Sequence, residues 1–135
     1  MSNDRVIRRA LWASAVFNMG GALSFAFPDS LGRLAGFPPG PVPVLYSATL
    51  TMLIALLGAT YAWLASQPVI DRPLVGFAAI GKASFFVVVV GCWLAGEVSA
   101  LGVFSAAGDL VFAAIFARWL MADAPAVSIA SRATL

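Results

Sequence analysis

The fold is decided by two apolar segments, LVGFAAIGKASFFVVVVGCWLA at residues 74–95 and LGVFSAAGDLVFAAIFARWLM at residues 101–121. As a helix that rises about 1.5 Å per residue, each is long enough to cross a hydrocarbon layer of about 30 Å. Each also holds one full charge deep inside it, Lys82 in the first and Asp109 in the second. Gly96–Ser99 forms a tight turn between them, so the two helices are expected to run antiparallel.

The composition of the whole chain is that of a membrane protein. Of its 135 residues, 61% are hydrophobic and 10% are charged, whereas an ordinary soluble domain is about 25% charged. The stretches between the apolar runs are too short to form a separate soluble core, which needs about 50 residues or more. We therefore expect one transmembrane domain over residues 1–135.

Composition also excludes several functions. The chain has one cysteine, Cys92, and no histidine, so thiol exchange through a CxxC pair and imidazole ligation of a metal or haem are ruled out. The net charge is only +2, and the basic residues do not form the aromatic-interleaved cluster that is typical of nucleic-acid binding. We expect no metal, no cofactor and no nucleic-acid partner.

Two further apolar runs predict helices at residues 10–27 and 44–65. The first run is long for the core of a signal peptide and no small-x-small cleavage site follows it, so we interpret it as a transmembrane helix. Prolines break the chain between residues 28 and 43. Leu31, Leu34 and Phe37 nevertheless stand near helical spacing, which predicts a short helix in the membrane interface. The small-residue tail at residues 122–135 is expected to be disordered.

The arginines set the expected orientation of these helices. Arg33 falls on one side of the membrane, and the other arginines fall on the opposite side: Arg5, Arg8, Arg9, Arg72, Arg118 and Arg132. Because cytoplasmic loops carry an excess of Lys and Arg, both termini are expected in the cytoplasm and the short helix outside it. The predicted interface anchors agree: they are Trp12, Trp63 and Trp119 on the cytoplasmic side, and Tyr46 and Trp93 on the other. The predicted fold is an all-α, integral membrane four-helix bundle.

Small residues share one face on three of these helices. The faces consist of Ser14, Ala15, Asn18, Gly21 and Ala22; of Ser47, Thr51, Ala55, Gly58 and Ala62; and of Gly102, Ser105, Ala106, Asp109 and Ala113. Such faces let helix backbones approach closely in lipid, so Asp109 is predicted to point into the bundle.

Lys82 and Asp109 form the candidate site. An ionised Lys or Asp near the centre of a bilayer costs about 2.5–3.5 kcal/mol, so two of them in one short chain call for an explanation. Lys82 lies about 12 Å from the cytoplasmic end of its helix, and Asp109 lies about as far from the opposite end of the next helix. Because the two helices run antiparallel, their α-carbons are expected to differ in depth by about 6 Å. A lysine side chain spans that difference, and Asn18 at similar depth on the first helix can complete the hydrogen bonds.

Three interpretations of these charges stay open. They form a structural ion pair that locks two helices together. Alternatively, they form a site for a small ligand, a proton or a lipid headgroup, which is the default reading of ionisable groups inside a membrane. In the third interpretation, Lys82 snorkels to the cytoplasmic interface and never meets Asp109.

The segments GKASFF at residues 81–86 and GDLVFAAIFARWL at residues 108–120 resemble those of small bacterial four-helix membrane proteins of the DoxX-like kind. The resemblance extends along the chain in layout and carries no catalytic motif onto these positions. It implies a multi-pass protein of the bacterial inner membrane that associates with membrane oxidoreductases.

Three functions fit this reading. The favoured one is non-enzymatic, either an accessory subunit of a larger membrane complex or a binder of a small ligand or lipid, since the sequence shows no nucleophile–base pair, phosphate loop or metal-ligand set. The second is a proton-coupled exporter that works as a homodimer, with Asp109 as the proton carrier. The third is an enzyme acting on a lipid or quinone, with Lys82 as acid or electrophile. In each case the lipid bilayer is the first partner.

Overall fold

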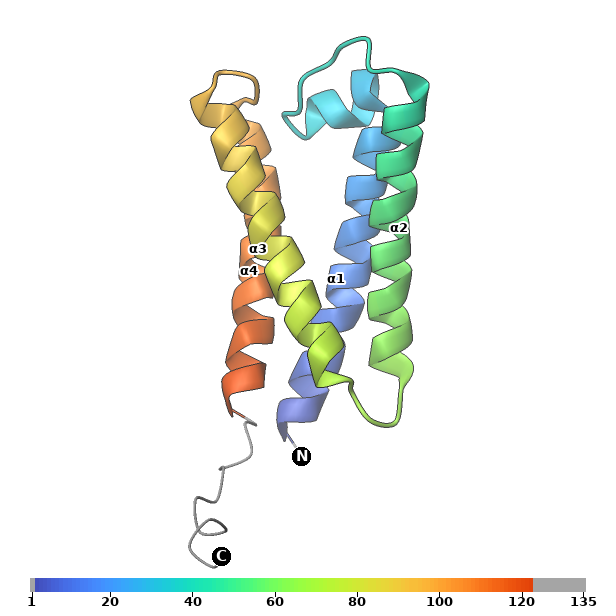
Figure 1. Cartoon of the computed structure of the whole chain (residues 1–135), viewed down its shortest axis with the longest axis vertical. Coiled ribbons are helices and arrows are strands. Elements are labelled where there is room, and N and C mark those ends of the chain that lie inside the picture. The colour runs from blue at the N-terminus through green and yellow to red at the C-terminus, as the bar shows by residue number, and fades with distance from the viewer. Residues whose placement is uncertain (1, 123–135) are drawn as a thin grey trace, which may run out of the picture.

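A computed structural model describes residues 2–122 of the chain, and in this part every regular element is helical (Figure 1). Four helices are long: α1 (Ser2–Ala26), α2 (Val44–Ser66), α3 (Arg72–Leu94) and α4 (Ala100–Ala122). A short π-helical turn, η1 (Pro28–Gly32), follows α1. The predicted all-α class is confirmed.

Three of the long helices, α2, α3 and α4, are long and apolar enough to cross a membrane. The fold is therefore compatible with a helical membrane bundle. α1 is less apolar, because Asp4 and the three arginines at positions 5, 8 and 9 occupy its first turns. That α1 adds a fourth membrane span stays a prediction, and so does the side on which the termini lie.

The helix boundaries differ from those expected mainly at α1, which begins at Ser2 rather than at residue 10. Asp4 lies in its first turn, where an acidic side chain interacts favourably with the helix dipole. The short helical turn begins at Pro28, inside the proline-rich segment where a short helix was expected; proline suits a first turn because its missing N–H needs no partner there. α2, α3 and α4 agree with the expected ranges within two residues. The tail predicted to be disordered lies outside the described residues from position 123 onward.

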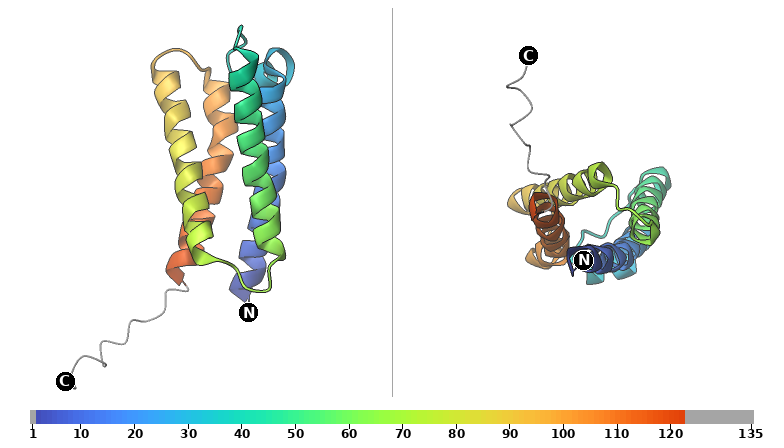
Figure 2. Two further views of the ribbon diagram at one scale, coloured as in Figure 1. Left: turned by 45° about the vertical axis from the view of Figure 1, so that its right-hand side comes forward. Right: turned by 90° about the horizontal axis from the view of Figure 1, so that it is seen from below.

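The four long helices form two antiparallel hairpins, α1–α2 and α3–α4. Cα atoms within 8 Å of each other join the two helices of each hairpin and join α1 to α4, whereas no such pair within residues 2–122 joins α2 to α3. Seen from below, the helices surround a central space (Figure 2). The hairpins converge at the end where the N-terminus lies and diverge toward the end that carries η1 (Figure 1). The two hairpins therefore approach each other closely along α1 and α4 and lie farther apart along α2 and α3.

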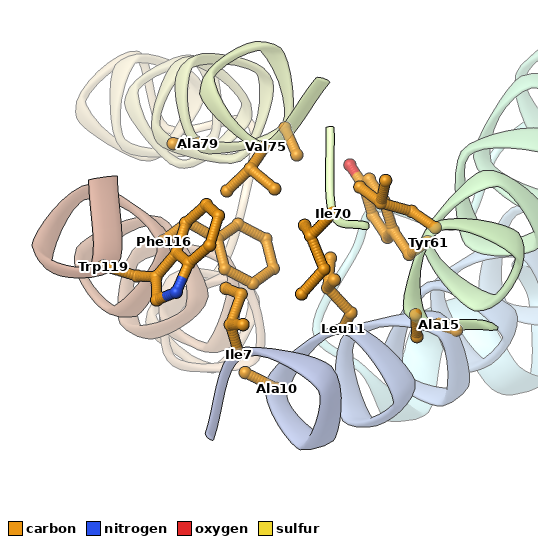
Figure 3. Packing of buried hydrophobic residues seen from close by; sticks show 13 residues of the cluster. Ile7, Ala10, Leu11, Ala15, Tyr61, Ile70, Val75, Ala79, Phe116 and Trp119 are labelled. Atoms are coloured by element: carbon orange, nitrogen blue, oxygen red, sulfur yellow. The ribbon is translucent and has the colours of Figure 1, made fainter. Parts of the chain in front are cut away.

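A hydrophobic core closes the convergent end, and all four helices contribute to it (Figure 3). Ile7 and Leu11 of α1, Leu64 of α2, Val75 of α3 and Phe116 of α4 are almost completely buried. In lipid, where no hydrophobic drive favours helix contact, close packing of this kind is what holds helices together.

Small residues allow the close approach within the α1–α2 hairpin. A Cβ at Gly58 would lie 3.2 Å from both the Ala15 carbonyl oxygen and the Asn18 Cβ, and a Cβ at Gly21 would lie 3.7 Å from Ile54. These contacts agree with the small-residue faces predicted for the first and second helices.

Two arginines at the convergent end bind the carboxyl ends of neighbouring helices. Arg8 of α1 donates hydrogen bonds to the carbonyls of Ala65, Gln67 and Pro68 at the end of α2. Arg72, the first residue of α3, donates to the Leu120 carbonyl near the end of α4. The last carbonyls of a helix have no partner within the helix, and a cationic donor there also complements the helix dipole. Each arginine therefore caps the helix that pairs with its own.

The aromatic residues proposed as interface anchors fall into two groups. Trp12, Trp63, Trp93 and Tyr46 are exposed, as an anchor in the membrane interface requires. Trp119 is only 8% exposed and packs into the core, with the Arg72 guanidinium 5.0 Å from its ring. Its predicted role as an anchor does not fit this burial, because the end of α4 lies against α1 and α3 instead of facing lipid.

A strap formed by residues 35–37 joins the two hairpins at the divergent end. The Gly36 carbonyl accepts a hydrogen bond from the Ser99 hydroxyl at 2.9 Å, and the Ala35 carbonyl accepts one from the Ser105 hydroxyl at 2.8 Å. Gly36 has a φ of 85°, and a Cβ there would collide with the backbone of Gly102. Glycine is therefore required at position 36 both for its conformation and for the close approach.

Candidate ligand-binding site

The structure brings Lys82, Asp109 and Asn18 together in one buried cluster. The Lys82 ammonium donates to Asp109 Oδ1 at 2.6 Å and to Asn18 Oδ1 at 2.8 Å. Lys82 is 3% exposed, and the other two residues are also buried. The cluster joins α1, α3 and α4, and Lys82 does not snorkel to the interface, so the interpretation in which the two charges never meet is wrong.

The pattern of residues along α3 and α4 explains why the two charges face each other. On α3 the buried face carries Val75, Ala78, Ala79 and Lys82, and on α4 it carries Gly102, Ala106, Asp109, Ala113 and Phe116. Steps of three and four residues keep these positions on one side of a helix. The small residues that precede each charge allow the two backbones to lie close together, so the charged side chains meet between them.

Three aromatic rings surround the Lys82 ammonium. Its nitrogen lies 5.4 Å from the ring centroid of Phe17 and 5.3 Å from those of Tyr61 and Phe112. A cation within about 6 Å of an aromatic face is attracted by the quadrupole of the ring. The rings and the two oxygen acceptors together take the place of the water that the ammonium loses on burial.

Sequence reasoning missed these rings, although local signals were present. Phe17 precedes Asn18 directly, and Phe112 follows Asp109 by one helical turn. Tyr61 is the only hydroxyl-bearing ring inside the second apolar run beyond its first turn. Periodicity places such residues on helix faces, but the gathering of three rings from three helices around one atom depends on how the hairpins pack.

An apolar cavity of about 580 Å³ adjoins the cluster, which supplies charged and amide groups to its lining. Ligand pockets in proteins commonly have about 300–1,000 Å³, apolar walls and a few polar groups that fix orientation. The walls here come from all four long helices and from the strap, and their larger apolar side chains include Phe25, Leu50, Ile54, Leu57, Phe77 and Phe85. The arrangement has the character of a site for a mainly apolar molecule with one polar group.

The cavity is bounded at both ends of the fold and open toward one side. Tyr61 belongs both to its lining and to the hydrophobic core at the convergent end. At the divergent end, Phe37 of the strap lies in the lining and packs against Phe25, with 5.2 Å between the ring centroids. On the side where no Cα atoms of α2 and α3 lie within 8 Å of each other, Leu53 and Phe77 line the cavity while remaining 49% and 64% exposed. The opening therefore faces outward between α2 and α3.

The Asp109 carboxylate keeps hydrogen-bonding capacity toward this cavity. A carboxylate offers about four acceptor positions, and among the described residues only Lys82 donates to it. Asp109 belongs to the cavity lining and keeps 12% of its side chain exposed. Within residues 2–122 no cluster of three or more Cys, Asp or Glu side chains is placed to hold a metal ion.

Comparison with protein families, with curated proteins and with solved structures finds no match to this chain.

Proposed function

We propose that this protein is a four-helix bundle of the bacterial inner membrane that binds a small, mainly apolar ligand or lipid within the bilayer. The observation that carries the proposal is the placement of the Lys82–Asp109–Asn18 cluster on the wall of an apolar cavity of about 580 Å³. An ion pair that only joined two helices would need no such space beside it. Polar groups that converge on one part of an apolar pocket are the usual means of orienting a ligand.

The geometry favours this function over the exporter. A proton carrier has to bind and release a proton readily, but the Asp109 carboxylate lies 2.6 Å from the buried Lys82 ammonium. Protonation of Asp109 would leave that ammonium buried without a counter-charge, which is strongly unfavourable. The geometry favours it over the enzyme as well, because Lys82 as a reactive group would first have to leave both of its acceptors.

The resemblance to DoxX-like proteins supports a further part of the proposal, which concerns the complex in which the protein works. In this view the binder is an accessory subunit that works beside a membrane oxidoreductase. Purification in a gentle detergent should then recover a stoichiometric partner together with the bound ligand. Recovery of a single polypeptide under those conditions, with ligand bound, would remove the accessory role and leave the binding function intact.

The binding function is tested by filling the cavity. Gly81 of α3 borders it, and a Cβ at this position would meet no atom within 4 Å, so Gly81→Phe should place a ring at the cavity without disturbing the packing. Gly91 on the same helix is the matched control, because a Cβ there also meets no atom within 4 Å and Gly91 does not line the cavity.

Native mass spectrometry of the protein released from its own membranes should show a bound small molecule on the wild type and on Gly91→Phe. The occupancy should fall at least tenfold on Gly81→Phe. Equal occupancy on all three proteins, or no bound molecule on the wild type, would contradict a ligand site in this cavity.

A further inference from the structure

We propose that the ligand is an uncharged lipid alcohol, whose hydroxyl group donates a hydrogen bond to Asp109 and whose apolar body enters the cavity from the bilayer between α2 and α3. This inference rests on the binding function proposed above and specifies the chemical class of the ligand.

The charge of the cluster is the first reason. Lys82 and Asp109 neutralise each other at 2.6 Å inside the protein. An anionic head group would compete with Asp109 for the ammonium, and a cationic head group would compete with Lys82 for the carboxylate. Either exchange leaves one buried charge without its partner, which is the costly state for such a pair. The site therefore favours a head group without net charge.

The remaining hydrogen-bonding capacity is the second reason. Two donors of the Lys82 ammonium are used by Asp109 and Asn18, and three aromatic rings lie around it. The Asp109 carboxylate, which only accepts, borders the cavity with acceptor capacity to spare. The Asn18 amide also lines the cavity, and it uses one of its two N–H donors, toward the Ile54 carbonyl. A hydroxyl group supplies a donor without a charge. Ethers, esters and ketones bring only acceptors, so they can meet the Asn18 amide but leave the spare capacity of the carboxylate unused, whereas a hydroxyl group can both donate and accept.

The walls and the opening are the third reason. Beyond the cluster and Tyr61, the polar side chains of the lining are Ser24 and Ser105, and their hydroxyls already donate to the carbonyls of Gly20 and Ala35. These walls therefore suit a hydrocarbon body. The opening between α2 and α3 is flanked by the exposed side chains of Leu53 and Phe77 on two helices apolar enough to span a membrane. A molecule dissolved in the bilayer meets this opening directly.

The test uses the full-length protein in nanodiscs and a long-chain alcohol that carries a photoreactive diazirine at the far end of its chain. The labelled peptides should come from α2 and α3 at the cavity. Four unlabelled competitors of equal chain length distinguish the head groups: the alcohol, its methyl ether, the carboxylic acid and the primary amine. We expect the alcohol to compete at concentrations at least tenfold lower than each of the other three.

Variants test separately the hydrogen bond to Asp109 and the binding of the apolar body in the cavity. Replacing both charges, in Lys82→Met/Asp109→Leu, should retain labelling and abolish the preference for the alcohol over the ether. Gly81→Phe should reduce labelling by all probes at least tenfold, and Gly91→Phe should label like the wild type.

Each alternative outcome has a distinct meaning. If the acid, the amine or the ether competes as well as the alcohol while Gly81→Phe still blocks labelling, the assignment to alcohols is wrong and the binding function stands. If the double variant keeps the preference for the alcohol, Asp109 is not the recognising group and the proposal fails. Labelling that no competitor reduces, or that Gly81→Phe leaves unchanged, would overturn both the ligand class and the binding function.

Discussion

Gly108 of α4 lies directly against the ring of Phe17 on α1: a Cβ at position 108 would fall 2.5 Å from two carbons of that ring. The same ring covers the Lys82 ammonium at 5.4 Å and packs against Phe112, with 5.6 Å between the ring centroids. The contact between α1 and α4 and the enclosure of the buried charge therefore depend on the absence of a side chain at Gly108.

Gly108→Ala is expected to destabilise the protein because the added methyl group displaces the Phe17 ring. Overpacking of this kind costs about 1–3 kcal/mol, and the better helix propensity of alanine offsets about 1 kcal/mol of that cost. Gly91→Ala is the control, since a Cβ there meets no atom within 4 Å. Thermal unfolding in detergent should show a lower midpoint for Gly108→Ala and an equal or higher midpoint for Gly91→Ala; the reverse order would contradict the close contact.

The ion pair predicts strongly non-additive mutations. Lys82→Met and Asp109→Leu each leave one buried charge alone, which costs about 3–5 kcal/mol. Because the double replacement removes both charges, it should recover most of the stability lost in the single variants. The measurement is the unfolding free energy of the four proteins in detergent. Additive losses would mean that the two charges contribute separately, against the 2.6 Å contact.

Asn18 and Ser14 offer a matched comparison on α1. Both are buried, but Asn18 accepts a hydrogen bond from the Lys82 ammonium, whereas the Ser14 hydroxyl has no partner among the described residues. Asn18→Ala should lower stability by about 1.5–3 kcal/mol, the range for hydrogen bonds to charged groups. Ser14→Ala should be neutral or stabilising, because it removes an unpaired buried polar group. If chemical unfolding shows equal losses of stability for the two variants, the Asn18 amide contributes only through the volume that it fills.

The strap can be tested with two glycines that share a conformation. Gly36 and Gly96 have φ angles of 85° and 79°, but only Gly36 touches another backbone, that of Gly102. Gly96→Ala should cost about 1 kcal/mol for the strained φ alone. Gly36→Ala should cost more and should also speed proteolysis of the loop at residues 33–43, because the strap is forced away from Ser99. Similar effects of the two substitutions would argue that the strap does not hold the hairpins together.

Most of the helical framework could be read from the sequence, because helix formation in an apolar run depends on local periodicity and length. The ranges of α2, α3 and α4 follow from long, mainly apolar runs between proline and glycine breaks, and the helical spacing along α4 already turns Asp109 inward. The start of α1 does not follow in this way, because the charged segment before residue 10 carries no apolar signal although the helix extends back to Ser2.

The candidate site likewise combines features that can be predicted from the sequence with features that depend on tertiary packing. Residue counts along the two apolar runs are enough to predict that Lys82 and Asp109 lie at similar positions on neighbouring antiparallel helices, since each residue adds a fixed rise along a helix. The packing of the hairpins, by contrast, is what gathers Phe17, Tyr61 and Phe112 around the ammonium and leaves a cavity with its opening between α2 and α3. These features depend on the angle between two hairpins, and that angle is set by contacts between distant residues, such as Gly36 with Gly102 and Gly108 with Phe17, that no local pattern encodes.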